Sequence, residues 1–154
     1  MNKGKHSELG EVYTPDPVIK DIIQEMISGE LSPNTQIGIN FDKNEIWLEP
    51  SMGDGRLLVA VKKMLQKKGF AEKDILERLY GVEINPESCQ KAILALYGPG
   101  DLTERTNPNA KVRKWHHSVW GDIENLVCTD SFSYSFNFSQ NTKIHGFDWL
   151  AIEE

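Results

Sequence analysis

The chain has few cysteines and no long apolar run, and these two absences exclude several protein classes. Its 154 residues include only Cys89 and Cys128, which are far apart and lack the Cys-x-x-Cys spacing of zinc and redox sites. Cys89 falls in a predicted helix, where we expect it to be buried. No apolar stretch approaches the roughly 18 residues that cross a membrane, and the polar start is unlike a signal peptide. We therefore expect a cytoplasmic protein without membrane association.

Clusters of histidine are also scarce. His116 and His117 are the only neighbouring histidines, and adjacent side chains of a strand point to opposite faces. Such a pair is a poor chelate, so the sequence predicts no metal site.

Basic residues are outnumbered by acidic ones. The chain has 17 Lys and Arg against 23 Asp and Glu, a net charge of −6, which disfavours independent binding to DNA phosphates. The nearest approach to a basic patch comprises Arg105, Lys111, Arg113 and Lys114. We interpret this stretch as a solvated loop in preference to a nucleic-acid contact. Any contact with DNA is therefore expected to be weak or indirect.

What the sequence does contain is typical of one soluble globular domain. Apolar residues make up 39% and charged residues 26% of the chain, which is ordinary for that class. The length suits a single domain with a substantial core. We expect residues 1–9, which are polar, to be flexible, and residues 10–154 to form the domain.

The most informative segment is 47–55, which reads Trp-Leu-Glu-Pro-Ser-Met-Gly-Asp-Gly. An apolar run ends on a glutamate and a proline, a Gly53-x-Gly55 turn follows, and an apolar helix pattern comes next. In open α/β sheets, ligands bind at such a turn, beyond the carboxyl end of a strand. Two glycines let the backbone approach a bulky ligand, although they also suit a tight turn alone. Leu58 replaces the third glycine of the dinucleotide motif, which argues against that fold.

Two further apolar runs meet acidic residues downstream. The first ends at Glu83, and Asn85 and Pro86 then fit the N-cap and first position of a helix. The second reaches Asp122 and Ile123. The Glu83 carboxylate can accept hydrogen bonds from two ribose hydroxyls. Asp122 can accept a hydrogen bond from an adenine amine, while Ile123 packs on the adenine ring. Each carboxylate alone also fits a helix cap or the surface, but three successive acidic strand ends favour a nucleoside-containing cofactor.

This order of motifs resembles the S-adenosylmethionine-dependent methyltransferases and, within them, the adenine-N6 DNA methyltransferases. Segment 10–18, Gly-Glu-Val-Tyr-Thr-Pro-Asp-Pro-Val, is similar to the family's N-terminal Gly-x-x-Tyr-Thr-Pro segment. The resemblance covers residues 10–55, 79–98 and 117–123. It implies S-adenosylmethionine as the cofactor and methylation of DNA adenine, as in restriction-modification systems.

The resemblance also implies a set of cofactor contacts. They are Tyr13 and Thr14 at the methionine end, Glu49 at its amino group, Gly53 and Gly55 along the turn, Glu83 at the ribose, Asp122 and Ile123 at the adenine, and Pro50 and Ile84 as further contacts. No catalytic residue is predicted, because the family's Asn/Asp-Pro-Pro-Tyr/Phe signature is missing. That signature binds the target amine and stacks on a flipped base. Glu153 and Glu154 stand roughly where it would begin.

The fold expected from these patterns is a truncated Rossmann-like class I methyltransferase sheet. It has a parallel core in the strand order 3-2-1-4 and helices on both faces. We expect strands at 45–49, 79–83, 115–120 and from 145 onward, helices at 16–28, 56–67, 70–78 and 86–97, and a half-buried strand or hairpin arm over 128–142. The fourth strand would be an open edge, and open edges recruit a second copy or another chain.

Three functional hypotheses follow. The first is an adenine-N6 DNA methyltransferase-like protein that binds S-adenosylmethionine and needs a partner subunit for catalysis. The second is a catalytically silent interaction or regulatory module of the same fold. The third is a protein that consumes or sequesters S-adenosylmethionine. The retained cofactor residues and the missing catalytic signature favour the first.

Overall fold

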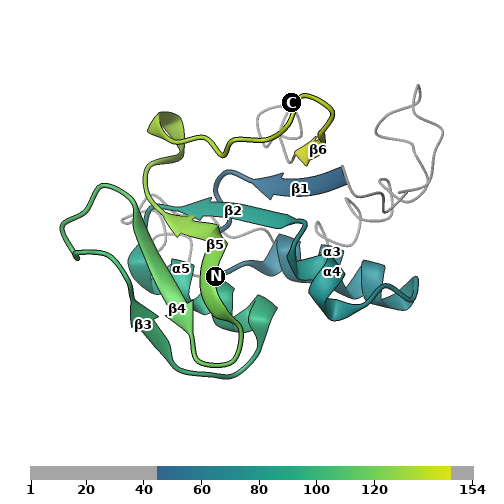
Figure 1. Ribbon diagram of the computed structural model, residues 1–154, viewed down its shortest axis with the longest axis horizontal. Helices are drawn as coiled ribbons and strands as arrows, with labels where there is room; N and C mark the ends of the chain where they lie inside the picture. Colours follow the sequence, from purple (N-terminus) through teal and green to yellow (C-terminus); the bar gives the residue numbers. More distant parts are fainter. Residues whose placement is uncertain (1–44, 147–154) are drawn as a thin grey trace, which may run out of the picture.

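A computed structural model of the protein describes residues 45–146, so Tyr13, Thr14, the helix predicted over 16–28 and residues 147–154 lie outside the described part. Six strands form one sheet in the order β3-β4-β5-β2-β1-β6 (Figure 1). The strands are β1 (Glu45–Glu49), β2 (Leu79–Glu83), β3 (Leu102–Glu104), β4 (Arg113–His117), β5 (Gly121–Cys128) and β6 (Lys143–Gly146). The helices are α3 (Arg56–Lys67), α4 (Glu72–Leu76), α5 (Pro86–Tyr97) and the 3-10 turn η1 (Ser131–Ser133).

The centre of the sheet is parallel. Strand β1 pairs in parallel with β2 and β6, and β2 pairs in parallel with β5. Strands β3 and β4 extend the sheet beyond β5 by antiparallel pairing. The carboxyl ends of β1, β2 and β5 therefore lie along one edge, which we call the carboxyl edge.

The two long helices begin and end where local chemistry requires. Helix α3 starts after Gly55, which has a φ of 89°, and α5 starts at Asn85, whose side chain accepts a hydrogen bond from the Ser88 amide at 3.1 Å. Pro86 fits the first turn of α5, where its missing N–H costs nothing. Gly98 ends the helix. The predicted boundaries 56–67 and 86–97 are both confirmed.

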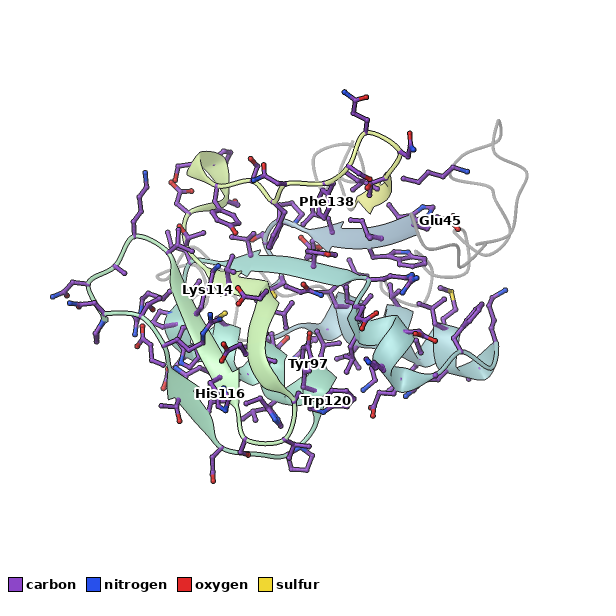
Figure 2. All side chains as sticks on the ribbon, in the orientation of Figure 1. Glu45, Tyr97, Lys114, His116, Trp120 and Phe138 are labelled. Atoms are coloured by element: carbon purple, nitrogen blue, oxygen red, sulfur yellow. The ribbon has the colours of Figure 1, made fainter. Side chains whose placement is uncertain are left out.

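The core lies between the sheet and the helices. Its members are buried apolar side chains that include Trp47, Leu58, Leu65, Ile93, Leu96 and Leu126. Within residues 45–146 the helices cover one face of the sheet (Figure 1). On the opposite face Tyr80 packs edge-to-face against Phe136 and Phe138, and Phe138 lies above the sheet in Figure 2. The predicted cover of helices on both faces is therefore seen on one face of the described part. No helix in this part is long and apolar enough to span a membrane.

The predicted third strand is wrong. Residues 115–120 were expected to run parallel beside the second strand, but β4 ends at His117 and runs antiparallel to β5. A short turn joins the two strands, with His117 opposite Gly121, whose φ of 83° suits a three-residue hairpin loop. Strand β5, which the sequence analysis did not predict, occupies the place beside β2.

The strand predicted over 128–142 is also wrong. The Asp130 side chain accepts a hydrogen bond from the Phe132 amide at 3.0 Å, and this contact starts the turn η1. Tyr134 and Phe138 both pack near Phe136, so these aromatic side chains share one side, as period-two spacing implies. Period-two spacing here reflects an aromatic cluster laid over Tyr80, without strand pairing.

Candidate cofactor site

Three loops meet at the carboxyl edge. They are residues 50–55 after β1, residues 84–85 after β2 and residues 129–132 after β5. Because the three strands are parallel neighbours, the side chains that follow them converge on one region. Two of the three acidic strand ends predicted from sequence, Glu49 and Glu83, lie at this edge.

Glu83 holds the glycine turn against β2. Its side chain is 3% exposed, and its two carboxylate oxygens accept hydrogen bonds from the amides of Gly53 and Asn85, both at 2.9 Å. The Met52 amide also donates to the Val82 carbonyl at 2.9 Å. The hydrogen bonds from Gly53 and Asn85 fix the Glu83 carboxylate at the end of β2.

The two glycines of the turn serve different ends. Gly55 has a φ of 89°, and a side-chain carbon there would lie 3.1 Å from the Ala92 backbone, so close packing with α5 already explains this glycine. Gly53 also adopts a positive φ, 57°, and its amide donates to Glu83. Gly53 thus shapes the 50–55 loop at the carboxyl edge, whereas Gly55 lets α3 approach α5.

Glu49 lies at the base of the same turn. It is 1% exposed, and one of its carboxylate oxygens accepts from the Ser51 amide at 2.9 Å. Pro50 is exposed in the turn. The carboxylate is therefore fixed in position at the last residue of β1, the strand end that the sequence predicted.

Asp122 and Ile123 are not part of this group. Both lie at the start of β5, and the strand runs eight residues before it reaches the carboxyl edge. The Asp122 carboxylate is 2.7 Å from Nδ1 of His116 and 3.4 Å from Nε of Arg105, and the hydrogen bond with His116 is the main reason that its pKa is lowered. Ile123 is 2% exposed and lies in the core opposite Trp115. The sequence predicts Asp122 at the end of a strand, whereas the structure places it at the beginning of one.

Asp130 and Phe132 occupy the region that the sequence analysis assigned to Asp122 and Ile123. The amide of Thr129 donates to the Glu83 carbonyl at 3.0 Å, which joins the end of β5 to the end of β2 immediately before Asp130. Phe132 is 99% exposed and Ile84 is 59% exposed. A signal was present in the sequence, because Leu-Val-Cys-Thr-Asp over 126–130 is another apolar run that ends on a carboxylate.

The residues at this edge suit a ligand with several donors and a flat apolar part. Within the described part of the chain, Asp54 Oδ1 and Thr129 Oγ1 are buried without a hydrogen-bond partner. Leaving such an atom unpaired costs about 1–3 kcal/mol. The exposed side chains of Ile84 and Phe132 beside the carboxylates of this edge offer an apolar surface and hydrogen-bond acceptors, which suit a nucleoside.

The two thiols near the edge are not nucleophiles. Burial raises the pKa of Cys128 to about 11 and also raises that of Cys89, so both stay protonated at neutral pH. No metal-binding cluster of His, Cys, Asp and Glu occurs in residues 45–146.

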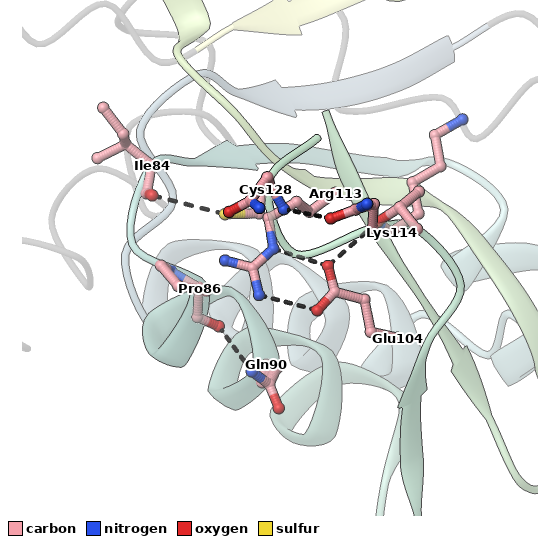
Figure 3. A network of polar contacts seen from close by, with 10 residues as sticks. Ile84, Pro86, Gln90, Glu104, Arg113, Lys114 and Cys128 are labelled. Atoms are coloured by element: carbon pink, nitrogen blue, oxygen red, sulfur yellow. Dashed lines mark hydrogen bonds and ion pairs between the residues drawn. The ribbon is translucent and has the colours of Figure 1, made fainter. Parts of the chain in front are cut away.

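The basic stretch predicted as a solvated loop is largely paired internally. Arg113 binds Glu104, Arg105 lies 2.9 Å from Glu124, and Lys114 lies 3.0 Å from the same Glu124. These partners neutralise the cations locally, which leaves little positive potential for DNA phosphates. Figure 3 shows the Arg113 pair beside Cys128 and the carbonyl of Ile84.

Comparison with known proteins gives three structural neighbours and no curated relative. One is the ATP-dependent Type ISP restriction-modification enzyme LlaBIII bound to DNA, with 22% identity and a TM-score of 0.44 over 56% of this chain and 6% of that chain. Another is a DrdV–DNA complex, with 22% identity and a TM-score of 0.45 over 57% of this chain and 8% of that chain. The third is a nuclease-deletion mutant of the Type ISP restriction-modification enzyme LlaGI with a DNA substrate mimic, with 18% identity and a TM-score of 0.49 over 84% of this chain and 10% of that chain. No curated protein matches the chain. The chain spans a tenth or less of the length of each neighbour.

A family model decides the assignment. The model of N-6 DNA methylases matches residues 1–97, which include the N-terminal Tyr-Thr-Pro segment, the glycine turn, Glu83 and α5. This match covers more than half of the chain, and it confirms the resemblance predicted from the sequence. The chain belongs to the N-6 DNA methylase family.

Proposed function

We propose that this chain is the S-adenosylmethionine-binding part of an adenine-N6 DNA methyltransferase of the restriction-modification type. It requires a partner subunit for methyl transfer and works in the cytoplasm. The observation that carries the proposal is the joining of β5 to β2 by the hydrogen bond between the Thr129 amide and the Glu83 carbonyl. This bond sets Glu83 and Asp130 at neighbouring strand ends, where open α/β sheets bind nucleotides.

Each end of the cofactor has a matching group in the proposal. Glu83 accepts from the ribose hydroxyls, and Asp130, in place of Asp122, accepts from the adenine amine. Ile84 and Phe132, both exposed at this edge, contact the ring. Glu49 binds the methionine amino group with Tyr13 and Thr14, while Pro50, Gly53 and Gly55 line or shape the turn.

The chain's residues bind and orient the cofactor, which when bound supplies the methyl group. Residues 1–154 contain no Asn-Pro-Pro-Tyr or related signature, and in this proposal the partner subunit supplies the groups that bind the target adenine. DNA is likewise contacted mainly by that subunit, since the chain carries a net charge of −6 and its basic stretch is paired internally.

The cofactor site is tested by isothermal titration of the full chain with S-adenosylmethionine, using Asp130→Ala and Asp122→Ala as a matched pair. Asp130→Ala is expected to weaken binding by at least about tenfold, or 1.4 kcal/mol. Asp122→Ala should leave affinity unchanged, because Asp122 lies at the opposite end of β5. A wild-type chain that binds no cofactor overturns the proposed function, and an equal loss in both variants overturns the assignment of Asp130.

The need for a partner is tested by methyl transfer. The chain alone, incubated with methyl-labelled cofactor and adenine-containing duplex DNA, is expected to leave the DNA unlabelled. Labelled N6-methyladenine formed by the chain alone would refute the requirement for a partner. Consumption of the cofactor without DNA would instead favour a protein that breaks it down.

The site of partner binding that we propose is β6. Among the described strands it lies at one end of the sheet and β3 at the other, and within that set β6 is paired on one side only, with β1. An outermost strand can add a strand from another chain or from a second copy. Sedimentation of the full chain tests the homo-oligomer, and a monomer across the accessible concentration range would count against it and favour a different subunit.

A further inference from the structure

Gly81, in the middle of β2, lies against the 50–55 loop. A side-chain carbon added there would collide with Met52 Sδ, and it would lie 3.2 Å from Met52 Cβ and 3.1 Å from Leu58 Cδ1. Gly81 does not have a positive φ, so the backbone of β2 would accept another residue without strain. A glycine inside a strand often marks a place where another part of the chain comes close. Gly81 is such a place, because Met52 occupies the space that its side chain would fill.

Met52 attaches the loop to β2 through both its side chain and its backbone. The side chain is 5% exposed and belongs to the hydrophobic core, whereas Pro50 and Ser51 of the same loop are exposed. The Met52 amide donates to the Val82 carbonyl at 2.9 Å, and the Met52 carbonyl accepts from the Gly55 amide at 2.9 Å. Met52 is therefore the residue by which the loop is seated on the strand.

Two successive positions on one face of β2 receive the loop. Residues 81 and 83 point to the same face, because side chains alternate along a strand. Gly81 leaves room for the Met52 side chain, and the Glu83 carboxylate accepts from the amide of the next loop residue, Gly53, at 2.9 Å. The position of the loop on the strand thus depends on two adjacent contacts.

Met52 also lies between the two loop amides that contact the candidate cofactor carboxylates. The Ser51 amide donates to Glu49 at 2.9 Å, and the Gly53 amide donates to Glu83 at 2.9 Å. Displacing Met52 from β2 would therefore move the donors on either side of it. A carboxylate whose donor moves loses part of what fixes its orientation.

We propose that Gly81 is a positioning residue for the methionine and ribose ends of the cofactor. Its missing side chain lets Met52 seat on β2, and this seat sets the two flanking amides against the carboxylates that end β1 and β2. Gly81 itself does not touch the cofactor. The proposal rests on the proposed function for its ligand, but the seated loop is a property of the cofactor-free chain.

The test compares Gly81→Ala with a matched variant, Gly100→Ala, in the full chain. A side-chain carbon at Gly100 would collide with Cε1 of His117, which is buried, and Gly100 also lacks a positive φ. Both variants therefore force one methyl group against a buried side chain. His117, however, lies opposite Gly121 at the start of β5, the other end of that strand from the carboxyl edge.

Titration with S-adenosylhomocysteine provides the first readout. Gly81→Ala is expected to weaken binding by about fivefold or more, because overpacking displaces the loop. Gly100→Ala should change the affinity by less than about twofold, although it lowers stability. Wild-type affinity in Gly81→Ala would overturn the proposal, and an equal loss in both variants would do the same by assigning the loss to stability.

A second substitution in the same contact tests whether the added methyl group acts through Met52. The double variant Gly81→Ala/Met52→Ala removes the sulfur with which the methyl group collides and keeps every backbone amide of the loop. It should bind at least about threefold more tightly than Gly81→Ala, even though it loses apolar burial relative to wild type. An affinity no better than that of Gly81→Ala would overturn the proposal.

Hydrogen exchange of the cofactor-free chain provides a readout independent of the ligand. The amides of Met52 and Gly53 should exchange faster in Gly81→Ala than in wild type, and the increase should exceed that at Trp47, whose amide donates to the Arg78 carbonyl before the start of β2. An equal increase at Trp47, or no increase at Met52 and Gly53, would overturn the positioning role even if wild type binds no cofactor. Faster exchange confined to the loop, in a chain that binds no cofactor, would retain the seated loop and reject the proposed function alone.

Discussion

The carboxyl edge and the opposite edge of the sheet use their polar groups in different ways. At the opposite edge, buried His117 accepts at Nδ1 from the amides of Val119 and Trp120 at 3.0 and 3.2 Å, and its Nε2 lies 3.0 Å from the Gly98 carbonyl. At the carboxyl edge, Thr129 Oγ1 is buried without a partner in the described part of the chain. His117 thus has a protein partner at each ring nitrogen, whereas Thr129 Oγ1 has none within the described residues.

Apolar side chains repeat this contrast. Trp120 and Tyr97, near the opposite edge, pack edge-to-face with ring centres 6.0 Å apart, and Trp120 Nε1 donates to the Tyr97 carbonyl at 2.8 Å (Figure 2). Phe132, at the carboxyl edge, is almost fully exposed. The comparison indicates that variants of the opposite edge should change stability, and that variants of the carboxyl edge should change affinity.

The largest expected effect is on stability, in His117→Ala. The substitution leaves the amides of Val119 and Trp120 without their acceptor and opens a space in the core, at a cost of about 3 kcal/mol. Urea unfolding monitored by tryptophan fluorescence measures the loss. Cofactor affinity of the folded fraction should remain within about twofold of wild type. A large loss of affinity with little loss of stability would break the contrast between the edges.

The next effect is on affinity, in Phe132→Ala. Because the side chain is 99% exposed, its removal should change the free energy of unfolding by less than about 0.5 kcal/mol. An aromatic ring that stacks on a base contributes about 1–3 kcal/mol, so binding of S-adenosylmethionine should weaken about fivefold or more. Isothermal titration beside Val119→Ala, an exposed apolar residue at the opposite edge, provides the control. Equal affinities in the two variants would remove Phe132 from the site.

A smaller effect is expected for Trp120→Phe. The phenyl ring retains most of the packing against Tyr97 and removes only the indole N–H that donates to the Tyr97 carbonyl. The free energy of unfolding should fall by about 1 kcal/mol, with no change in affinity for the cofactor. Thermal unfolding measures the shift, and a stability equal to that of wild type would show that water replaces the lost donor.

The parts of the fold that the sequence predicted have strong local signals. The boundaries of β1, β2, α3 and α5 all agree with those predicted, because each has an apolar pattern of one period and a turn or cap at its end. Glu49 and Glu83 followed from the same signals. The family assignment required only these segments and the N-terminal motif.

The prediction of the antiparallel part of the sheet was wrong for a physical reason. Strand β5 alternates exposed and buried residues at its start, and it becomes continuously apolar and buried only from Leu126, where it pairs in parallel with β2. The first half of β5 resembles a strand end in the sequence, which favoured Asp122 over Asp130. Which of two aspartates ends a strand depends on tertiary pairing, and a hairpin turn at Val119 gives only a weak local signal.

The smallest expected effect is the dependence of stability on pH through Glu104. Hydrogen bonding from Arg113 lowers the pKa of Glu104 from its ordinary 4.5 in the folded chain, so the unfolded chain binds this proton more readily. The stabilisation is therefore complete above pH 4.5 and is lost as the pH falls through the folded pKa. Between about pH 5 and 3, wild type should lose more stability than Glu104→Gln, which has no carboxylate to protonate. Urea unfolding at each pH measures the difference, which should shrink in high salt because the pair is partly exposed. Parallel losses in the two proteins would mean that Glu104 contributes nothing to the acid dependence.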